Sequence, residues 1–455
     1  MRKETHPGPL GHPSEEGRAA PIPSSEGKRK RVNICLSCWR HVSSLCRVSG
    51  GVGRPPRTSG KSRFRVRFIT RLKSLACFLF AALLGLVPMD SPAQTTGELV
   101  FGQSASLSGP ASELGQGMRL GLLAAFEEIN REGGVHGRRL VLESLDDAYE
   151  PEAAIANTRQ LIDQRGVFAL VGAVGTPTSR AAQPIATEAG VPYIAPFTGA
   201  EFLRDAQRRS NVVNMRASYY QETEEILTRL TTDLGVQRVG ILYQNDSYGR
   251  AGLTGVRRAV ARYNLPLVVE ADYPRNTEAV KVALLDLRRP RPEAIVIIGA
   301  YKPAAALIRW ARRLDFNPYF ITISFVGGAA LARELGPDGA GVYVTQVVPF
   351  PTEASLPVVA QYQQALAAMD PDSEPGFVSL EGYLAGRLVV EGVRLAGPNP
   401  TRQGFLNALL EAESIDLGGF LLRYGPADNQ GSDRVYLTII DQRGRVRPVR
   451  RMTRP

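Results

Sequence analysis

From Glu98 onward, short apolar segments alternate with longer amphipathic ones, and this alternation limits the folds open to the chain. The apolar segments are typical of buried strands and read LVFGQSA, RLVLESLDD, VFALVGAVG, VPYIAP, RVGILYQND, LPLVVEADYP and EAIVIIGAY. Between most of them, apolar residues recur at the spacing of an amphipathic helix. Strands that alternate with helices form parallel sheets with crossover helices, so the sequence predicts an α/β fold.

The strands fall into two series, because a loop follows VPYIAP before RVGILYQND opens the second series. No low-complexity linker separates the two series. We therefore expect two lobes with parallel sheets, joined by a compact crossover near residues 216–220. Sheets of this kind bind ligands at the carboxyl ends of their strands.

The net charge of +11 is located almost entirely at the N-terminal end of the chain. Residues 1–93 hold 17 Lys and Arg against 5 Asp and Glu, whereas the remaining residues hold 38 against 39. A chain that binds nucleic acid needs basic side chains to neutralise phosphates. The sequence therefore predicts no nucleic-acid partner.

The same N-terminal segment holds all four cysteines and three of the four histidines, so that His136 is the only one of either type beyond it. Thiol catalysis and zinc sites are thereby excluded from the two lobes. Gly115 and Gly117 with Gly121 miss the spacing of a dinucleotide fingerprint, and they fall inside an expected helix. An all-carboxylate metal site stays open but has no motif behind it, and we expect no metal, no cofactor and no enzymatic activity.

Residues 63–93 have the order of a secretory signal peptide, in which arginines and one lysine precede the apolar run 74–87. Small residues at Ser91 and Ala93 predict cleavage between Ala93 and Gln94, which gives a periplasmic protein. An uncleaved anchor is the alternative. Residues 1–62 are rich in Pro, Gly, Ser and Arg and have no periodic apolar pattern, so we expect a non-native or disordered extension.

Small and hydroxyl-bearing residues follow several of the expected strands, in segments 104–108, 172–178, 195–199 and 245–248. In the second segment the strand ends at Gly172, and Pro177 suits the first position of a helix. Thr176 then falls at the N-cap. Because the N-terminus of a helix favours negative charge, this segment predicts an anion site.

Two tyrosines, Tyr248 and Tyr301, follow expected strands of the second series and precede expected helices. Aromatic packing at a loop explains such residues as well as ligand contact does, but their position at the ligand edge favours contact. Asp146 and Asp147 are interpreted as a solvated strand end, and His136 lies in a turn without a nucleophile partner.

The chain resembles the type I periplasmic binding proteins of the branched-chain amino acid class, which deliver solutes to ABC importers. The likeness rests on SLSGPASELGQGMRLGLLAAFEEINREGGVHGRRLVLESLDD, LVGAVGTPTSRAAQPIATEAGVPYIAPFTG, ILYQNDSYGRAG and IGAYKPAAALIRWAR. It implies a monomer whose two Rossmann-like lobes, joined by three crossover segments, close on a small amino acid or related carboxylate. It implies an importer permease as partner. The implied lobes are 97–215 with 348–418, and 216–347 with 419–455.

The resemblance also implies a set of ligand-contacting positions, with the ligand carboxylate at the Thr176 segment and the tyrosines on the second lobe. These positions are Leu114, Val174, Gly175, Thr176, Phe197, Thr198, Gly199, Tyr248, Tyr301 and Ser324.

One position departs from the family pattern. Ser324, in ITISFVGG, stands where amino-acid binders of this family carry the acid that pairs with the ligand ammonium. A buried ammonium without a counter-charge is costly. Either Asp246 or Glu381 substitutes, or the ligand is not an α-amino acid. A ligand sensor that signals to a membrane receptor remains the alternative to transport.

Overall fold

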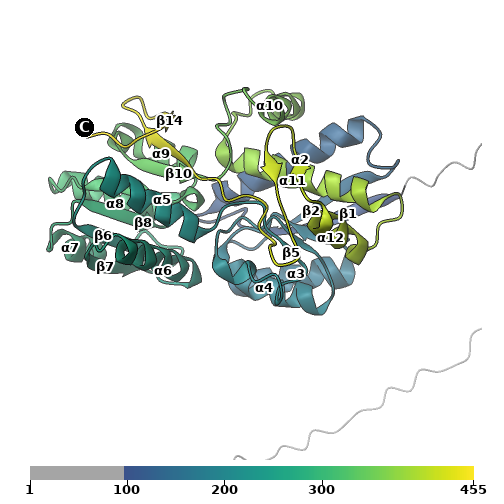
Figure 1. The fold of residues 1–455 in the computed structure, drawn as a ribbon, viewed down its shortest axis with the longest axis horizontal. Helices are drawn as coiled ribbons and strands as arrows, with labels where there is room; N and C mark the ends of the chain where they lie inside the picture. The colour runs from purple at the N-terminus through teal and green to yellow at the C-terminus, as the bar shows by residue number, and fades with distance from the viewer. Residues whose placement is uncertain (1–96, 455) are drawn as a thin grey trace, which may run out of the picture. The chain divides into compact units, whose positions relative to one another are not determined.

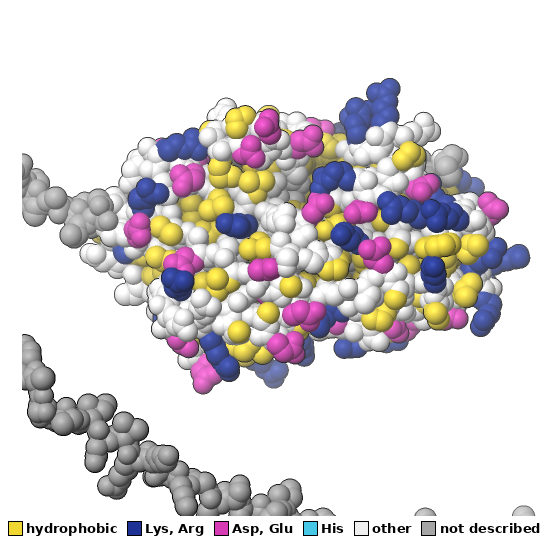
Figure 2. All heavy atoms as spheres, turned by 180° about the vertical axis from the view of Figure 1, so that it is seen from behind, with side chains coloured by type: hydrophobic (Ala, Val, Ile, Leu, Met, Phe, Trp, Pro, Cys, Tyr) yellow, Lys and Arg dark blue, Asp and Glu magenta, His cyan; other side chains and the backbone are white. Residues whose placement is uncertain are grey.

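The computed structural model describes residues 97–454, which form two parallel-sheet lobes with their helices (Figure 1). The predicted extension and signal peptide therefore lie outside the described residues. Within 97–454, no helix is both long and apolar enough to cross a membrane. Acidic and basic side chains both occur across the face that Figure 2 shows.

The first lobe is built on a parallel sheet with the strand order β2-β1-β3-β4-β5. Its strands are β1 (Glu98–Ala105), β2 (Arg139–Asp146), β3 (Ala169–Val171), β4 (Tyr193–Ile194) and β5 (Val212–Val213). Its helices are α2 (Ser112–Arg131), α3 (Pro151–Arg159), α4 (Thr176–Glu188), α10 (Pro357–Met369), α11 (Phe377–Ala396) and α12 (Arg402–Glu411). Phe101 of β1, which lies between β2 and β3, pairs with Leu142 on one side and Ala169 on the other. The carboxyl ends of these strands meet at one edge, where the anion site is predicted.

The second lobe is built on a larger sheet with the strand order β14-β13-β10-β9-β8-β6-β7. Its strands are β6 (Val239–Gln244), β7 (Leu267–Tyr273), β8 (Ala294–Ile298), β9 (Tyr319–Thr322), β10 (Tyr343–Gln346), β13 (Tyr436–Ile440) and β14 (Val446–Val449). Its helices are α5 (Tyr219–Thr232), α6 (Ser247–Arg262), α7 (Lys281–Arg288), α8 (Tyr301–Arg313) and α9 (Gly328–Leu335). Every residue of β8, which lies between β9 and β6, is buried, as expected of a parallel strand covered on both faces.

The C-terminal strands differ from the expectation of purely parallel sheets. Strand β13 runs antiparallel to β10, and β14 returns antiparallel to β13. The connection between β13 and β14 is short, and the Asp441 carboxylate closes it by accepting hydrogen bonds from the N–H groups of Arg443 and Arg445 at 2.8 and 2.9 Å. A connection of this length joins only antiparallel strands.

After α12 the chain forms a small antiparallel pair, β11 (Ile415–Asp416) with β12 (Leu421–Leu422), before it reaches the second lobe. On the way to the second lobe, the chain contacts the first sheet at Gln430, which forms a bridge with Asn214 just after β5. The chain then enters the second sheet at β13.

Helices α2 and α11 of the first lobe pack at very close range. A Cβ atom added at Gly121 of α2 would lie 1.9 Å from the Ser379 carbonyl oxygen and 2.4 Å from the Tyr383 nitrogen of α11. Glycine at this position lets the two backbones touch, as small residues do where helices approach closely. The contact fixes the N-terminal half of α11, which carries Glu381 toward the second lobe.

Candidate ligand-binding site

Three buried hydroxyl groups converge at the beginning of α4. The Thr176 and Thr198 hydroxyl oxygens lie 2.7 Å apart, and each lies 3.3 Å from the hydroxyl oxygen of Tyr219. None of the three side chains is more than 1% exposed. Thr176 and Thr198 come from the first lobe, whereas Tyr219 opens α5 of the second. The hydroxyl cluster, as we call these three residues, therefore joins the two lobes.

The local structure of α4 turns Thr176 toward this cluster. The N-cap is Gly175, with φ +110°, and α4 begins at Thr176. The prediction that Thr176 is the N-cap is therefore wrong by one residue, because glycine takes the left-handed backbone conformation that the turn requires. The Thr178 hydroxyl instead donates to the Val174 carbonyl at 2.6 Å. The Thr176 hydroxyl has no capping role, and its partners are the other two hydroxyls of the cluster.

The other predicted first-lobe positions hold the cluster in place. Val174 forms a bridge with Phe197, and the Gly175 N–H donates to the Phe197 carbonyl at 3.3 Å. The Tyr219 N–H donates to the Gly199 carbonyl at 2.7 Å. A Cβ atom added at Gly199 would lie 2.5 Å from the Tyr219 ring, so glycine is needed for this contact.

An aromatic cluster lies beside the hydroxyl cluster and draws rings from both lobes. Phe325 is its centre, with ring centroids 4.5 Å from Tyr248, 5.4 Å from Phe197 and 6.1 Å from Tyr149. The rings of Tyr219 and Tyr248 are 5.5 Å apart. Burial raises the pKa values of Tyr149 and Tyr248 well above the usual value, so both hydroxyls stay protonated. Among the described residues, neither hydroxyl has a hydrogen-bond partner.

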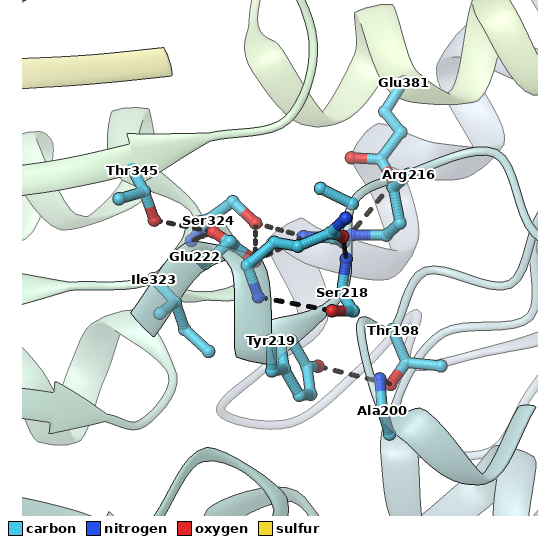
Figure 3. A network of polar contacts seen from close by, with 12 residues as sticks. Thr198, Ala200, Arg216, Ser218, Tyr219, Glu222, Ile323, Ser324, Thr345 and Glu381 are labelled. Atoms are coloured by element: carbon cyan, nitrogen blue, oxygen red, sulfur yellow. Dashed lines mark hydrogen bonds and ion pairs between the residues drawn. The ribbon is translucent and has the colours of Figure 1, made fainter. Parts of the chain in front are cut away.

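A buried ion network adjoins both clusters (Figure 3). Arg216 donates to the Ser324 hydroxyl, and its guanidinium lies 3.5 Å from Glu222 and 3.3 Å from Glu381. Glu222 accepts hydrogen bonds from the Ser324 N–H at 2.8 Å, the Ser324 hydroxyl at 3.0 Å and the Thr345 hydroxyl at 2.6 Å. The Arg216 guanidinium also lies 4.7 Å from the centre of the Phe197 ring. Arg216 thus links Glu381 of the first lobe to Glu222 and Ser324 of the second.

Arg216 is the cation of this network, and Glu381 and Glu222 are the two acids that it pairs with. Burial opposes the charge of Arg216, but Glu381 and Glu222 outweigh it and raise the pKa of the guanidinium above its usual value. Burial raises the pKa of Glu381 to about 7, although Arg216 acts in the opposite direction. The Glu222 carboxylate accepts three hydrogen bonds from Ser324 and Thr345 and pairs with Arg216.

We expect the free energy of unfolding to fall as the pH rises through the titration of Glu381. The unfolded carboxyl titrates near its ordinary value and the folded one near 7. Between these two pKa values the folded chain binds more protons than the unfolded chain. The protonated Glu381 carboxyl therefore contributes its full stabilisation below the unfolded pKa, and this contribution is lost as the pH rises past 7. Urea unfolding at pH 5 and pH 8 should show a loss of at least ~1 kcal/mol.

Burial also raises the pKa of Asp147, to about 6. Its titration therefore lowers the free energy of unfolding in the same direction as the pH rises. Glu381→Gln removes only the Glu381 part, so its stability profile should be flatter than that of the parent chain. Parallel profiles for the two proteins would contradict the assignment.

The two acids predicted as substitutes for an ammonium partner both have other partners. Asp246 caps α6, because one of its carboxylate oxygens accepts from the Tyr248 N–H at 2.9 Å and the Gly249 N–H at 3.1 Å. Its other oxygen accepts from Gln244 at 2.6 Å. Glu381 is paired with Arg216, as described above.

The remaining predicted positions lie apart from the hydroxyl cluster. Leu114 of α2 is fully buried against Gly327, two residues beyond Phe325, where an added Cβ atom would meet the leucine at 2.6 Å. It also lines a cleft of about 570 Å³ between α2, α9 and the beginning of α11. Tyr301 begins α8 and belongs to the apolar core of the second lobe. Its contact with a ligand stays a prediction.

Polar contacts also join the lobes at the ends of β2 and β7. Arg275 lies 2.7 Å from Glu150 and donates to the Tyr149 carbonyl at 2.5 Å. Asn276 donates to Glu150 at 2.6 Å. A further ion pair joins Arg333 of α9 to Glu113 of α2. The described residues contain no group of three His, Cys, Asp or Glu side chains able to hold a metal ion.

Several residues of the candidate site were not predicted from the sequence. Arg216 is the only charged residue in VVNMRASYY, and an isolated charge between an apolar strand and a helix start could have drawn attention to it. Tyr149 follows β2 at the predicted ligand edge, two residues beyond Asp147. Phe325 and Glu222 carry no local signal, because distant contacts define their roles.

The described geometry agrees with the comparisons to known proteins. A family model described as periplasmic binding protein matches residues 98–445. The chain belongs to the periplasmic binding protein family. The fold and family predicted from the sequence are thereby confirmed. As a periplasmic binding protein, it is a ligand-capturing receptor with a two-lobe α/β fold. Its family binds solutes rather than transforming them, and membership implies a location outside the cytoplasm.

Relatives of this periplasmic binding protein include Leu/Ile/Val-binding protein homolog 7 of Brucella abortus (strain 2308), which is 24% identical over 352 residues. The match covers 73% of this chain and 86% of the relative. A solved structure of a possible leucine/isoleucine/valine-binding protein from Rhodopirellula baltica SH 1 is 39% identical, with a TM-score of 0.75, and covers 79% of this chain and 98% of that one. A substrate-binding periplasmic protein from Ralstonia solanacearum is 30% identical, with a TM-score of 0.73, 77% of this chain covered and 100% of that one.

Proposed function

We propose that this receptor captures a small ligand bearing a carboxylate between its lobes and delivers it to the membrane permease of an ABC importer. The observation that carries the proposal is the hydroxyl cluster of Thr176, Thr198 and Tyr219 at the start of α4. Hydroxyls and helical N–H groups are donors suited to a carboxylate. The protein acts by binding alone and works as a monomer.

Ligand binding replaces the contacts among these hydroxyls with contacts to the carboxylate. Each hydroxyl can rotate to donate to a carboxylate oxygen, and the positive end of the α4 dipole adds to the attraction. Because the three hydroxyls come from both lobes, a bound carboxylate favours the closed arrangement. The relatives are named for binding leucine, isoleucine and valine, which supports a small ligand with a carboxylate.

Closure is proposed to occur about the crossover segments near Arg216, Pro349 and Gly418. The contacts of Arg275 and Asn276 with Glu150 then hold the closed form. Small-angle scattering should show a smaller radius of gyration when a binding carboxylate is added. An unchanged radius would contradict closure.

The mature protein is proposed to begin at Gln94 and to function in the periplasm. The basic residues, the apolar run and the small residues that end at Ala93 support this start. N-terminal sequencing of the exported protein tests it. Exported protein that retains residues before Gln94 would contradict the proposed cleavage.

Thr176→Val should lower the affinity for the tightest-binding acid of a panel of small carboxylates about ten- to hundredfold. The variant keeps the shape of the side chain and loses one hydrogen bond to a charged group, which contributes about 1.5–3 kcal/mol. Any loss of stability should come from the buried contacts with the Thr198 and Tyr219 hydroxyls, because the Thr176 hydroxyl does not cap α4. Calorimetry measures the affinity.

Thr254→Val is the matched control, because among the described residues the exposed Thr254 hydroxyl of α6 bonds only the Arg250 carbonyl, at 2.8 Å. Equal affinities of parent, Thr176→Val and Thr254→Val would place the carboxylate elsewhere.

A further inference from the structure

The acids around the candidate site are all engaged by groups of the protein itself. Glu222 accepts three hydrogen bonds and pairs with Arg216. Asp246 caps α6, and Asp147 accepts from the Ser104 hydroxyl at 2.7 Å and the Tyr149 N–H at 2.9 Å. A ligand ammonium buried here would need a carboxylate partner, because an unpaired buried charge is costly. None of these three acids is available to one.

Glu381 is the remaining acid, and Arg216 separates it from the hydroxyl cluster. Figure 3 shows Glu381 on one side of the Arg216 guanidinium, with Thr198 and Tyr219 on the other. An ammonium next to a carboxylate held by the hydroxyl cluster would therefore face the guanidinium before it reached Glu381. Two cations at such short range repel each other strongly in a buried site.

The polar atoms of the site that lack partners are donors. The Nε atom of Arg216 and the hydroxyls of Tyr149 and Tyr248 make no hydrogen bond to any residue of the described chain, and all three side chains are at most 1% exposed. Arg216 can only donate, and the two hydroxyls can donate as well as accept. An ammonium has no acceptor to offer them, whereas the oxygen atoms of an organic acid do.

We propose that the ligand is an organic acid without an amino group, whose oxygen atoms accept hydrogen bonds from Arg216 and from the Tyr149 and Tyr248 hydroxyls. The carboxylate lies at the hydroxyl cluster, and the rings of Phe197 and Phe325 contact the apolar part of the ligand. This inference rests on the proposed function, because it assigns the chemical class of the carboxylate that the receptor captures.

Pairs of probes that differ only at the α-carbon test the proposal on the parent chain. They are L-leucine with 4-methyl-2-oxopentanoate and with 4-methylpentanoate, and L-phenylalanine with phenylpyruvate and with 3-phenylpropanoate. Calorimetry should show at least one amine-free acid binding at least tenfold more tightly than its amino acid. An amino acid that binds as tightly as, or more tightly than, its amine-free partners would overturn the inference and leave the proposed function standing. Binding of no probe from either set would contradict both.

A second measurement examines the unpartnered donors. Tyr248→Phe keeps the ring and removes the hydroxyl, so we expect at least threefold weaker binding of the preferred acid. Tyr263→Phe is the matched control, because the Tyr263 hydroxyl bonds Thr228 at 2.6 Å, away from the site. Unchanged affinity in Tyr248→Phe would overturn the assignment of this hydroxyl to the ligand.

Discussion

Replacing Arg216 with methionine is expected to lower the free energy of unfolding by about 3–5 kcal/mol, because it leaves the Glu222 charge buried without its cation. The Glu222 side chain is fully buried and 3.5 Å from the guanidinium. The three donors from Ser324 and Thr345 remain, but they supply no full charge. Urea unfolding at pH 7 measures the loss.

The double variant Arg216→Met with Glu222→Gln should recover a large part of that loss, because it removes the unpaired charge while keeping an acceptor for the same donors. Arg229→Met is the matched control, since Arg229 pairs with Glu225 at 2.7 Å on a partly exposed face of α5. An exposed pair contributes about 0–1 kcal/mol. A double variant no more stable than Arg216→Met would show that lost packing, rather than unpaired charge, causes the effect.

The second large effect is expected at the contact between α2 and α11. Gly121→Ala should destabilise the chain by about 3 kcal/mol, because the new methyl group would overlap backbone atoms and overpacking costs about 1–3 kcal/mol or more. An added Cβ atom would lie 1.9 Å from the Ser379 carbonyl oxygen, and a backbone carbonyl cannot rotate away as a side chain can. Thermal and urea unfolding measure the change.

Gly117→Ala is the matched control one turn earlier on the same helix. Its added Cβ atom would lie 3.0 Å from Cγ1 and 3.1 Å from Cβ of Val378, so the overlap is far smaller than that of the 1.9 Å approach at Gly121. Alanine also favours the helix over glycine by about 1 kcal/mol, so this variant should be nearly neutral. If both variants lose the same stability, the close approach of α2 and α11 is not the cause.

The sequence predicts the fold well because the fold depends on local patterns. Apolar strands such as AIVII in β8 and amphipathic helices such as α6 have spacings that can be read within one segment. The position of Thr176 at the beginning of α4 was predictable for the same reason. Its exact role was not, because the φ of +110° at Gly175 moves the N-cap back by one residue.

The ion network could not be predicted, because its members are far apart in the chain. Arg216, Glu222, Ser324 and Glu381 come from a crossover, α5, the segment after β9 and α11. No spacing rule relates these residues, and the contacts exist only after both lobes have folded and met. The sequence did mark Ser324 as unusual, and the structure shows a guanidinium hydrogen-bonded to it.

The position of a bound carboxylate tests the central claim most directly. A crystal structure of the chain with its tightest-binding acid should place the carboxylate oxygens within hydrogen-bonding distance of the Thr176, Thr198 and Tyr219 hydroxyls. A carboxylate bound instead in the cleft between α2, α9 and the beginning of α11, away from these hydroxyls, would contradict the claim.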